Sequence, residues 1–415
     1  MLNALLPICC GLDVHKRSIT ACLLKTSASG EPTQAMRTFG TFTPELRALA
    51  QWLQAEGCRH VAMESTGVYW KPVYNVLEPI CEQLLLVNAQ HIKNVPGRKT
   101  DMKDAEWIAT VLQHGLVRGS FIPPQEIREL RELTRYRSTL VRERAAECNR
   151  IQKLLEHMNI KLASVATDVL GKSGQAMLKA ICRGEEDTAE LANLAKGRLR
   201  AKIPQLMDAL QGYLTETTRW LLRQQLHRVA ELDAAIAELD AKIEEVGRPF
   251  AEVLTLLDEI PGVNRRVAQI LISEIGIDMS RFPTSHKLAA WAGMSPGNNE
   301  SAGKKKSGKT RKGCSWLRAA LVEAGWAAGK MKKGYLQAQY HRLGRRRGKK
   351  RACVAVGHSI LVIAYTLIRD RKHYTDLGDD FFERHSGERL KTQLVRRLER
   401  LGYKVTVEPA LTPAA

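Results

Sequence analysis

The stretch PICCGLDVHKRSITACLL, residues 7–24, decides the fold expected for the N-terminal region. It holds two apolar, β-leaning runs, 7–13 and 17–24, which are separated by a polar turn at His15 and Lys16. Short apolar runs bounded by polar residues are typical of β-strands, so we expect a strand on each side of this turn.

Strand-like and helix-like patterns alternate along the chain after this stretch. Further strands are predicted for QAMRTFGTF (34–42), RHVAMES (59–65) and QLLLVNA (83–89), and helices for PELRALAQWLQAE (44–56) and DMKDAEWIATVLQ (101–113). Such alternation implies a mixed sheet covered by helices. The order of three strands, helix, strand, helix, strand and helix predicts an α/β domain of RNase H-like fold over residues 1–122.

Composition points to a polyanionic partner. The chain of 415 residues carries a formal net charge of +20, and residues 301–360 contain seventeen Lys or Arg but a single acidic residue, Glu323. Such a concentration of positive charge is typical of proteins that bind nucleic acid. We find no run of 18 apolar residues, so no membrane span is expected. The nine scattered cysteines, none in a CxxC pair, indicate reduced thiols in a cytoplasmic protein, and with a nucleic-acid partner we expect it to be associated with the nucleoid.

Four carboxylates stand at the ends of predicted elements. Asp13 follows a strand, Glu64 ends another, and Asp101 and Asp104 begin the helix at 101–113. The spacing of three puts both aspartates on one helix face. Converging carboxylates repel one another unless a cation joins them, and Mg²⁺ or Mn²⁺ bound by oxygen ligands can bridge to a phosphodiester. Taken singly, such residues are more often turn residues or helix caps.

A serine lies inside the basic segment. Ser301 follows Glu300 and precedes a Gly- and Lys-rich run, in a stretch that we expect to be a flexible loop. Nearby cations would stabilise a serine alkoxide and a phosphorane, so Ser301 is a candidate nucleophile. Ser307 and Ser315 are rival candidates, and a serine that merely contacts phosphate is the commoner case.

Two basic clusters are candidates for contacts with double-stranded DNA. Their cations would neutralise phosphates and make binding dependent on salt. The clusters lack interleaved aromatic residues, so stacking on single-stranded bases is not indicated. The first comprises Lys304, Lys305, Lys306, Lys309, Arg311 and Lys312, and the second Arg345, Arg346, Arg347, Lys349, Lys350 and Arg351.

The middle of the chain, residues 123–248, is predicted to be a helical arm. It begins after the pair Pro123 and Pro124, and residues 160–215 are expected to be irregular, with weak points at Gly171, Gly174 and Gly184. Apolar residues at alternating steps of three and four from Val229 to Val246 form a seam that favours a coiled coil. An amphipathic helix that packs on its own chain, as an intramolecular hairpin, explains the seam equally well.

A mainly helical region is predicted for residues 249–376, and a basic, irregular tail for residues 377–415. The region opens with LLDEIPGVNRRVAQILISEIG, residues 256–276, which resembles a helix-hairpin-helix that grips the DNA backbone. A plain pair of antiparallel helices is the alternative interpretation.

Five motifs together resemble the insertion-sequence-110 type of DEDD transposases, including the 1111 subgroup and the related pilin-gene invertases. GLDVHK (11–16), MESTGVYW (63–70) and KTDMKDAEWIA (99–109) are similar to the acidic motifs of this family. IPGVNRRVAQILISEIG (260–276) and AAWAGMSPGNNESAGKKKSGKTRKGCSWLRAAL (289–321) are similar to its C-terminal transposase domain. The resemblance covers nearly the whole chain.

The resemblance implies a RuvC-like domain that binds Mg²⁺ through the four acids, and a serine nucleophile at Ser301 that forms a phosphoserine–DNA intermediate. It also implies a homo-oligomer, dimer or tetramer, whose sites combine one subunit's acids with another's serine, and a structured guide RNA. Ala302 replaces a glycine common in the family, and the C-terminal region is longer. A RuvC-like nuclease that uses water as nucleophile, and a non-catalytic scaffold, are the alternatives.

Overall fold

The structure is a computed structural model that describes residues 5–26, 32–65, 67–88, 104–297, 299–301, 304–310 and 312–408. The chain divides into two units, Met1–Ile122 and Pro123–Ala415. The division falls immediately before the pair Pro123 and Pro124, which lack backbone N–H groups and so interrupt regular structure.

The described part of the first unit contains a five-stranded mixed sheet in the order β3-β2-β1-β4-β5. β2 runs antiparallel to β1 and β3, whereas β4 runs parallel to β1 and β5. The strands are β1 (Ile8–Val14), β2 (Ser18–Thr26), β3 (Pro32–Gly40), β4 (His60–Ser65) and β5 (Gln83–Val87). The mixed α/β character predicted from the sequence is confirmed.

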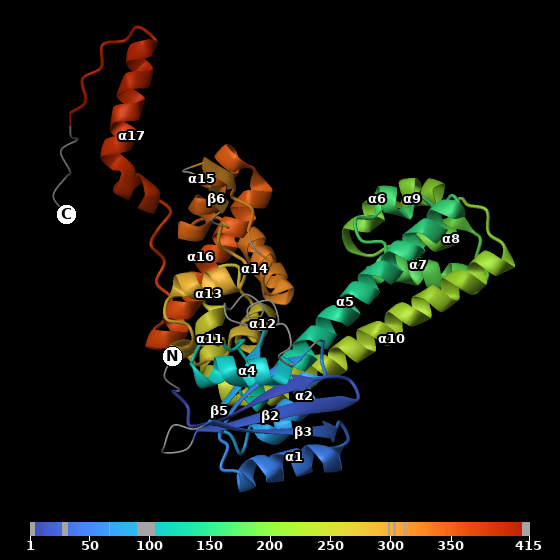
Figure 1. Cartoon of the computed structure of the whole chain (residues 1–415). Coiled ribbons are helices and arrows are strands. Elements are labelled where there is room, and N and C mark those ends of the chain that lie inside the picture. Colours follow the sequence, from blue (N-terminus) through green and yellow to red (C-terminus); the bar gives the residue numbers. More distant parts are fainter. Residues whose placement is uncertain are drawn as a thin grey trace. The chain divides into compact units, whose positions relative to one another are not determined.

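Helices cover both faces of this sheet, and Figure 1 shows α1 and α4 on opposite sides. Cys10, Leu12 and Val14 point to the face packed against α1 (Thr43–Ala55) and α2 (Trp70–Leu77). Cys9 and its neighbours on the other face pack against α4 (Asp104–Gln113). Because successive side chains alternate between faces, an apolar residue at nearly every position is required for a strand buried on both sides.

The second unit begins with two long helices, α5 (Gln125–His157) and α10 (Glu216–Gly247), which lie side by side (Figure 1). Arg137 pairs with Asp240 and Arg144 pairs with Asp233, so the two helices run antiparallel. The apolar seam of α10 faces α5, since Val229 is buried with the hydrophobic core that α5 helps to form. The seam is therefore used within the chain, as the intramolecular hairpin alternative proposed.

Short helices connect α5 to α10 and share one apolar core with both. They are α6 (Leu162–Val165), α7 (Lys172–Cys182), α8 (Thr188–Asn193), the 3₁₀ helix η1 (Gly197–Lys202) and α9 (Ile203–Leu210). Gly171 and Gly184 flank α7 as the weak points predicted, but Gly174 lies inside that helix. A Cβ at Gly174 would stand 1.9 Å from the Val169 carbonyl oxygen, so this glycine is required for close packing rather than for a break.

The rest of the second unit is mainly helical, and several of its helices pack around the long helix α16 (Lys349–Asp370). Backbones approach closely there, because a Cβ at Gly325 would stand 2.5 Å from the Cys353 carbonyl oxygen, and one at Gly357 would stand 2.7 Å from that of Leu321. The elements are η2 (Arg248–Phe250), α11 (Ala251–Asp258), α12 (Arg265–Ile275), η3 (Met279–Arg281), α13 (Ser285–Trp291), β6 (Asn299–Ser301), β7 (Lys304–Ser307), α14 (Ser315–Ala328), α15 (Tyr335–Arg347), α16 (Lys349–Asp370) and α17 (Phe381–Arg400).

Helix α16 is long and apolar enough to cross a membrane, which the sequence interpretation did not anticipate. However, 56% of its most apolar 18-residue stretch is buried inside the unit, where the helix packs against α11, α13, α14 and α15. Such burial is typical of the central helix of a folded domain, for which the same length and composition are needed.

Candidate active site

Two of the predicted carboxylates are direct neighbours in the sheet of the first unit. Asp13 of β1 and Glu64 of β4 are partners in the parallel register. Residues paired in register project from the same face of a sheet, and both lie near the carboxyl ends of their strands. The Asp13 side chain is 22% exposed and contacts His15, whose Nε2 lies 3.1 Å from Asp13 Oδ2. Glu64 is half-buried.

Helix α4 covers the sheet face that carries this pair. Gly11 lies on the same face as Asp13, two residues earlier, and packs directly against the first turn of α4. A Cβ at Gly11 would stand 2.3 Å from the Ala105 carbonyl oxygen and 2.4 Å from the Ala109 nitrogen. The contact brings Asp104, the first residue of α4, to the face that carries Asp13 and Glu64. The sequence interpretation overlooked Gly11, although a glycine inside a strand often marks such a close approach.

The fourth predicted carboxylate, Asp101, lies outside the described residues. Within the part of the chain that the structure describes, three or more His, Cys, Asp or Glu side chains do not gather closely enough to hold a metal ion. The structure thus pairs Asp13 with Glu64 and directs α4 toward them. The donor chemistry suits a hard cation, because carboxylate oxygens are the ligands that Mg²⁺ and Mn²⁺ take in proteins.

The predicted nucleophile lies on a β-hairpin of the second unit rather than in an open loop. Ser301 is the last residue of β6 and pairs with Lys304, the first residue of β7. A further bridge joins Pro296 to Thr310 at the base of the hairpin, where the Gly297 N–H donates to the Lys309 carbonyl oxygen over 3.0 Å. The side chain of Ser301 lies outside the described part of the structure.

The two predicted basic clusters differ in how far the structure describes them. In the first, Lys309 and Lys312 are exposed, Arg311 lies outside the described residues, and so do the side chains of Lys304, Lys305 and Lys306. In the second, all six cations are exposed around the corner between α15 and α16. That corner turns at Gly348, whose φ of +85° favours glycine. The six exposed cations of the second cluster therefore lie within seven consecutive residues at this corner.

The family comparison matches both units. Residues 10–160 match the model of the DEDD transposases of the insertion sequence IS110, described as a transposase. Residues 254–341 match the model described as "Transposase IS116/IS110/IS902 family". The chain belongs to the IS110 family of transposases. As a member of this family it is an enzyme that acts in DNA transposition.

Two curated proteins are similar to this transposase over most of their length. One is a probable family 20 transposase of Pseudomonas aeruginosa, 27% identical over 266 residues, which are 63% of this chain and 69% of the relative. The other is the transposase for insertion sequence element IS1111A of Coxiella burnetii, 24% identical over 297 residues, which are 70% of this chain and 72% of the relative.

The matched segments of the transposase include the elements that carry the predicted catalytic residues. The first match contains β1, β4 and α4, and the second contains the hairpin of β6 and β7. Neither match reaches the second basic cluster, which begins at Arg345, after the second match ends. That cluster and the C-terminal helix α17 thus lie beyond the residues that the two family models match.

The helix-hairpin-helix-like segment of the transposase is packed on both sides within its unit. At the turn, a Cβ on Gly262 would stand 2.3 Å from the Ala324 carbonyl oxygen of α14. At the start of α12, Arg265 pairs with Glu244 of α10 over 3.0 Å, and Arg266 pairs with Asp240 over 2.9 Å. The turn is thus covered by α14, and both arginines at the start of α12 are paired within the unit, so the plain pair of helices describes this segment better.

Proposed function

We propose that this transposase cleaves and rejoins DNA strands through a phosphoserine intermediate, with Ser301 as the nucleophile and a divalent cation at the reacting phosphate. The proposed cation ligands are the four acidic residues predicted from the sequence, namely Asp13, Glu64, Asp101 and Asp104. The observation that carries the proposal is the in-register pair of Asp13 and Glu64 on the sheet face covered by α4.

The fold of the first unit supports this proposal. The sheet has three antiparallel strands followed by two strands parallel to β1, and a helix packs across its central strands. This arrangement is the one expected of an RNase H-like, RuvC-like domain. Domains of this kind place carboxylates on the central strands and on a helix that crosses them. Here the central strand β1 carries Asp13, its neighbour β4 carries Glu64, and α4 begins with Asp104.

The proposed ligands are all carboxylates, which favours Mg²⁺ or Mn²⁺ over softer metals. When bound, the ion supplies positive charge to the reacting phosphate. Without it, the acidic side chains on one sheet face would repel both one another and the DNA backbone. The proposed ligand role would account for the placement of Asp13 and Glu64 side by side on one sheet face.

In the proposed reaction the Ser301 Oγ forms a bond to phosphorus, and the bond from phosphorus to one sugar oxygen breaks. That oxygen leaves with a proton, and the serine proton passes to the solvent or a nearby base. A sugar hydroxyl of a second strand then attacks the same phosphorus, which restores the serine and joins the strands. Cations of the hairpin segment, Lys309 and Lys312 among them, would balance the charge that develops on the phosphate.

We further propose that the active form is a homo-oligomer, dimer or tetramer, in which different copies of the chain contribute acids and serine. A structured RNA encoded beside the gene would select the DNA. Resemblance to the family supports both points, and the net charge of +20 favours nucleic-acid partners. Co-purification of a defined RNA, and loss of target choice after ribonuclease treatment, would test the second.

The deciding experiment traps the covalent intermediate on a nicked suicide duplex that carries the element's own ends. The native chain should give a protein–DNA adduct at Ser301, and Ser301→Ala should give none while still binding the duplex. Ser307→Ala is the matched control and should form the adduct normally. Asp13→Asn should lose cleavage in Mg²⁺ and in Mn²⁺. Cleavage without any adduct would instead indicate a RuvC-like nuclease that uses water.

A further inference from the structure

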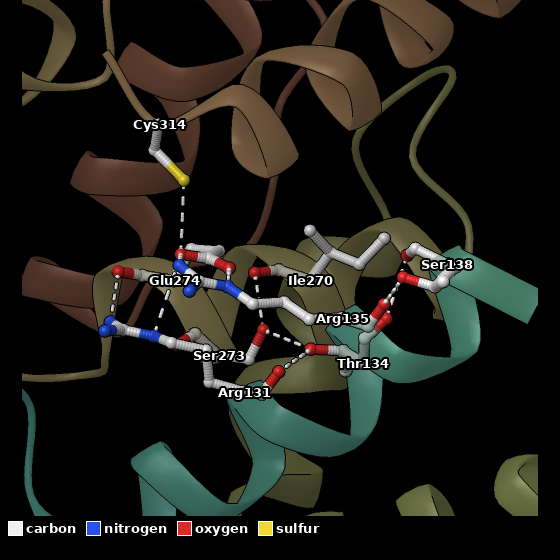
Figure 2. Close-up of polar contacts among 9 residues, drawn as sticks. Arg131, Thr134, Arg135, Ser138, Ile270, Ser273, Glu274 and Cys314 are labelled. Atoms are coloured by element: carbon white, nitrogen blue, oxygen red, sulfur yellow. Dashed lines mark hydrogen bonds and ion pairs between the residues drawn. The ribbon is translucent and has the colours of Figure 1, made fainter. Parts of the chain in front are cut away.

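A buried carboxylate of the second unit joins three separate parts of the chain. The side chain of Glu274, in α12, is only 1% exposed. Arg135 of α5 donates to its two oxygens over 2.7 and 2.8 Å, and the Cys314 thiol donates to Oε2 over 3.2 Å (Figure 2). A buried charge is tolerated when it is paired and hydrogen-bonded on all sides, so these partners hold Glu274 in one geometry.

Helix α5 also holds the last turn of α12. Arg131 donates from Nε to the Ser273 carbonyl oxygen over 2.8 Å and from Nη2 to that of Glu274 over 2.9 Å. The Thr134 and Ser273 hydroxyls lie 3.0 Å apart, and a dashed line joins them in Figure 2. The last carbonyl groups of a helix have no partner within it, and an arginine at that end satisfies them. The end of α12 is therefore fixed to the start of the helical arm.

The third part, Cys314, follows the hairpin that carries Ser301 and immediately precedes α14. A Cβ at its neighbour Gly313 would stand 2.4 Å from the Ala292 carbonyl carbon, so the chain is clamped there against the end of α13. Arg318 donates to the Thr310 hydroxyl over 2.8 Å at the base of the hairpin. The contact between Cys314 and Glu274 thus links the hairpin base to α12.

A second contact joins the same two regions. The Arg142 guanidinium lies 4.4 Å from the ring centroid of Trp316, in the first turn of α14, and that of Arg135 lies 6.0 Å away. Both arginines belong to α5, so one face of this helix contacts both Glu274 of α12 and Trp316 of α14. Cation–π contacts of this kind add to the orientation that the carboxylate provides.

We propose that Glu274 is a positioning residue for the Ser301 hairpin: held by Arg135 and Cys314, it fixes the hairpin base relative to the helical arm. The inference rests on the proposed function, because it takes Ser301 to be the nucleophile. Attack on phosphorus requires the oxygen to lie close to the phosphate and in line with the leaving group, so a small displacement of the hairpin base lowers the rate. Affinity for DNA depends on the many cations instead.

The test uses two substitutions at Cys314, which differ only in whether a donor to Glu274 remains. Cys314→Ala removes the donor and should lower the single-turnover rate of adduct formation by roughly tenfold, an effect expected of a misplacement well below 1 Å. Cys314→Ser keeps a hydroxyl donor and should restore most of the rate. The dissociation constant for the duplex and the melting temperature should change little in either variant.

Arg135→Lys keeps the charge but not the paired geometry, and should slow adduct formation in the same way. Arg144→Ala, which breaks an ion pair elsewhere on α5, is its control.

If Cys314→Ala and Arg135→Lys react at the native rate while Ser301→Ala is inactive, the positioning role is wrong and the nucleophile stands. If DNA affinity, melting temperature and the rate of adduct formation fall together in Cys314→Ala and Cys314→Ser restores none of them, Glu274 has a purely structural role. An active Ser301→Ala would refute the proposed function itself.

Discussion

Gly11 and Ala105 bring helix α4 into backbone contact with the central strand of the sheet. A Cβ on Gly11 would stand 2.3 Å from the Ala105 carbonyl oxygen, closer than any real contact of this kind. Ala105 follows Asp104, and Gly11 precedes Asp13 by two residues on the same sheet face. The absence of a side chain at position 11 therefore sets how closely the helix approaches the paired carboxylates of Asp13 and Glu64.

We predict that Gly11→Ala impairs DNA cleavage, because it moves α4 away from the paired acids Asp13 and Glu64, and that DNA binding is retained. The new methyl group must push α4 outward, which should cost roughly 1–3 kcal/mol in the free energy of unfolding, or somewhat more because the obstacle is backbone. Cleavage in Mg²⁺ and in Mn²⁺ should fall by at least tenfold, measured on a labelled duplex beside a binding assay.

Gly387→Ala is the control for this change. Gly387 lies in α17, and a Cβ added there would meet no atom within 4 Å. Alanine also favours a helix over glycine by about 1 kcal/mol, so this variant should be at least as stable as the native protein. Native cleavage by Gly11→Ala would show that the approach of α4 has no bearing on the acids.

The sequence predicted the first unit well, because its strands are short apolar runs with clear polar boundaries. The positions of Asp13 and Glu64 at the ends of such runs were enough to place each at a strand end, and the sheet shows that the two strands are neighbours. The contact between Gly11 and α4 could not be predicted from the sequence, because it depends on which face of the sheet the helix covers. Asp101 lies outside the described residues, so its position stays a prediction.

In the second unit the sequence pattern indicated helices but not their partners. The seam on α10 is equally suited to another protomer or to its own chain, and the pairings of Arg137 with Asp240 and of Arg144 with Asp233 show that α5 is the partner. Similarly, the turn at Gly262 resembles a DNA-binding turn until α14 is seen to cover it. Glu274 escaped notice because a lone glutamate in an apolar helix carries no local signal of its distant arginines.

Asp240 should contribute more to the stability of the helical arm than Asp233. Asp240 binds both Arg137 of α5 and Arg266 of α12 and is 23% exposed, whereas Asp233, among the described residues, pairs with Arg144 and is 46% exposed. We expect Asp240→Ala to lower the free energy of unfolding by roughly 1–3 kcal/mol and Asp233→Ala by about 0–1 kcal/mol, because exposed pairs are weak and shielded networks are stronger. Chemical denaturation of both variants measures the difference, and equal losses would contradict the network.

The corner between α15 and α16 should contact DNA phosphates. Replacing Arg345, Arg346 and Arg347 together with alanine removes three exposed charges from the end of α15. The slope of log binding constant against log salt concentration should become shallower by about 2–3, since each phosphate contact contributes about 0.9. Binding isotherms at salt concentrations from about 50 to about 200 mM would measure this slope. Lys196→Ala, an exposed cation between α8 and η1, is the control, and an unchanged slope in the triple variant would exclude the corner from the interface.

Three buried thiols in or beside the sheet, those of Cys9, Cys22 and Cys58, should make the first unit sensitive to alkali. Burial raises the pKa of Cys9 to about 12, and burial also raises the pKa values of Cys22 and Cys58 to about 11. In the unfolded chain a thiol has a pKa near 8.5–9, so the folded state favours the protonated form. Stability from these groups is therefore complete below about pH 8.5 and is lost as pH rises toward 11 and 12.

Hydrogen exchange of β1 and β2, followed from pH 8 to pH 11 after correction for the intrinsic rate, measures this loss. Protection in the native protein should fall steadily above about pH 9, and Cys22→Ala should flatten the decline because it removes one of the titrating groups. Cys148→Ala, in the helical arm, should leave the exchange of β1 and β2 unchanged. If the native thiols of the sheet are alkylated at pH 9 as fast as an exposed cysteine while protection persists, burial does not raise their pKa values and the alkaline loss has another origin.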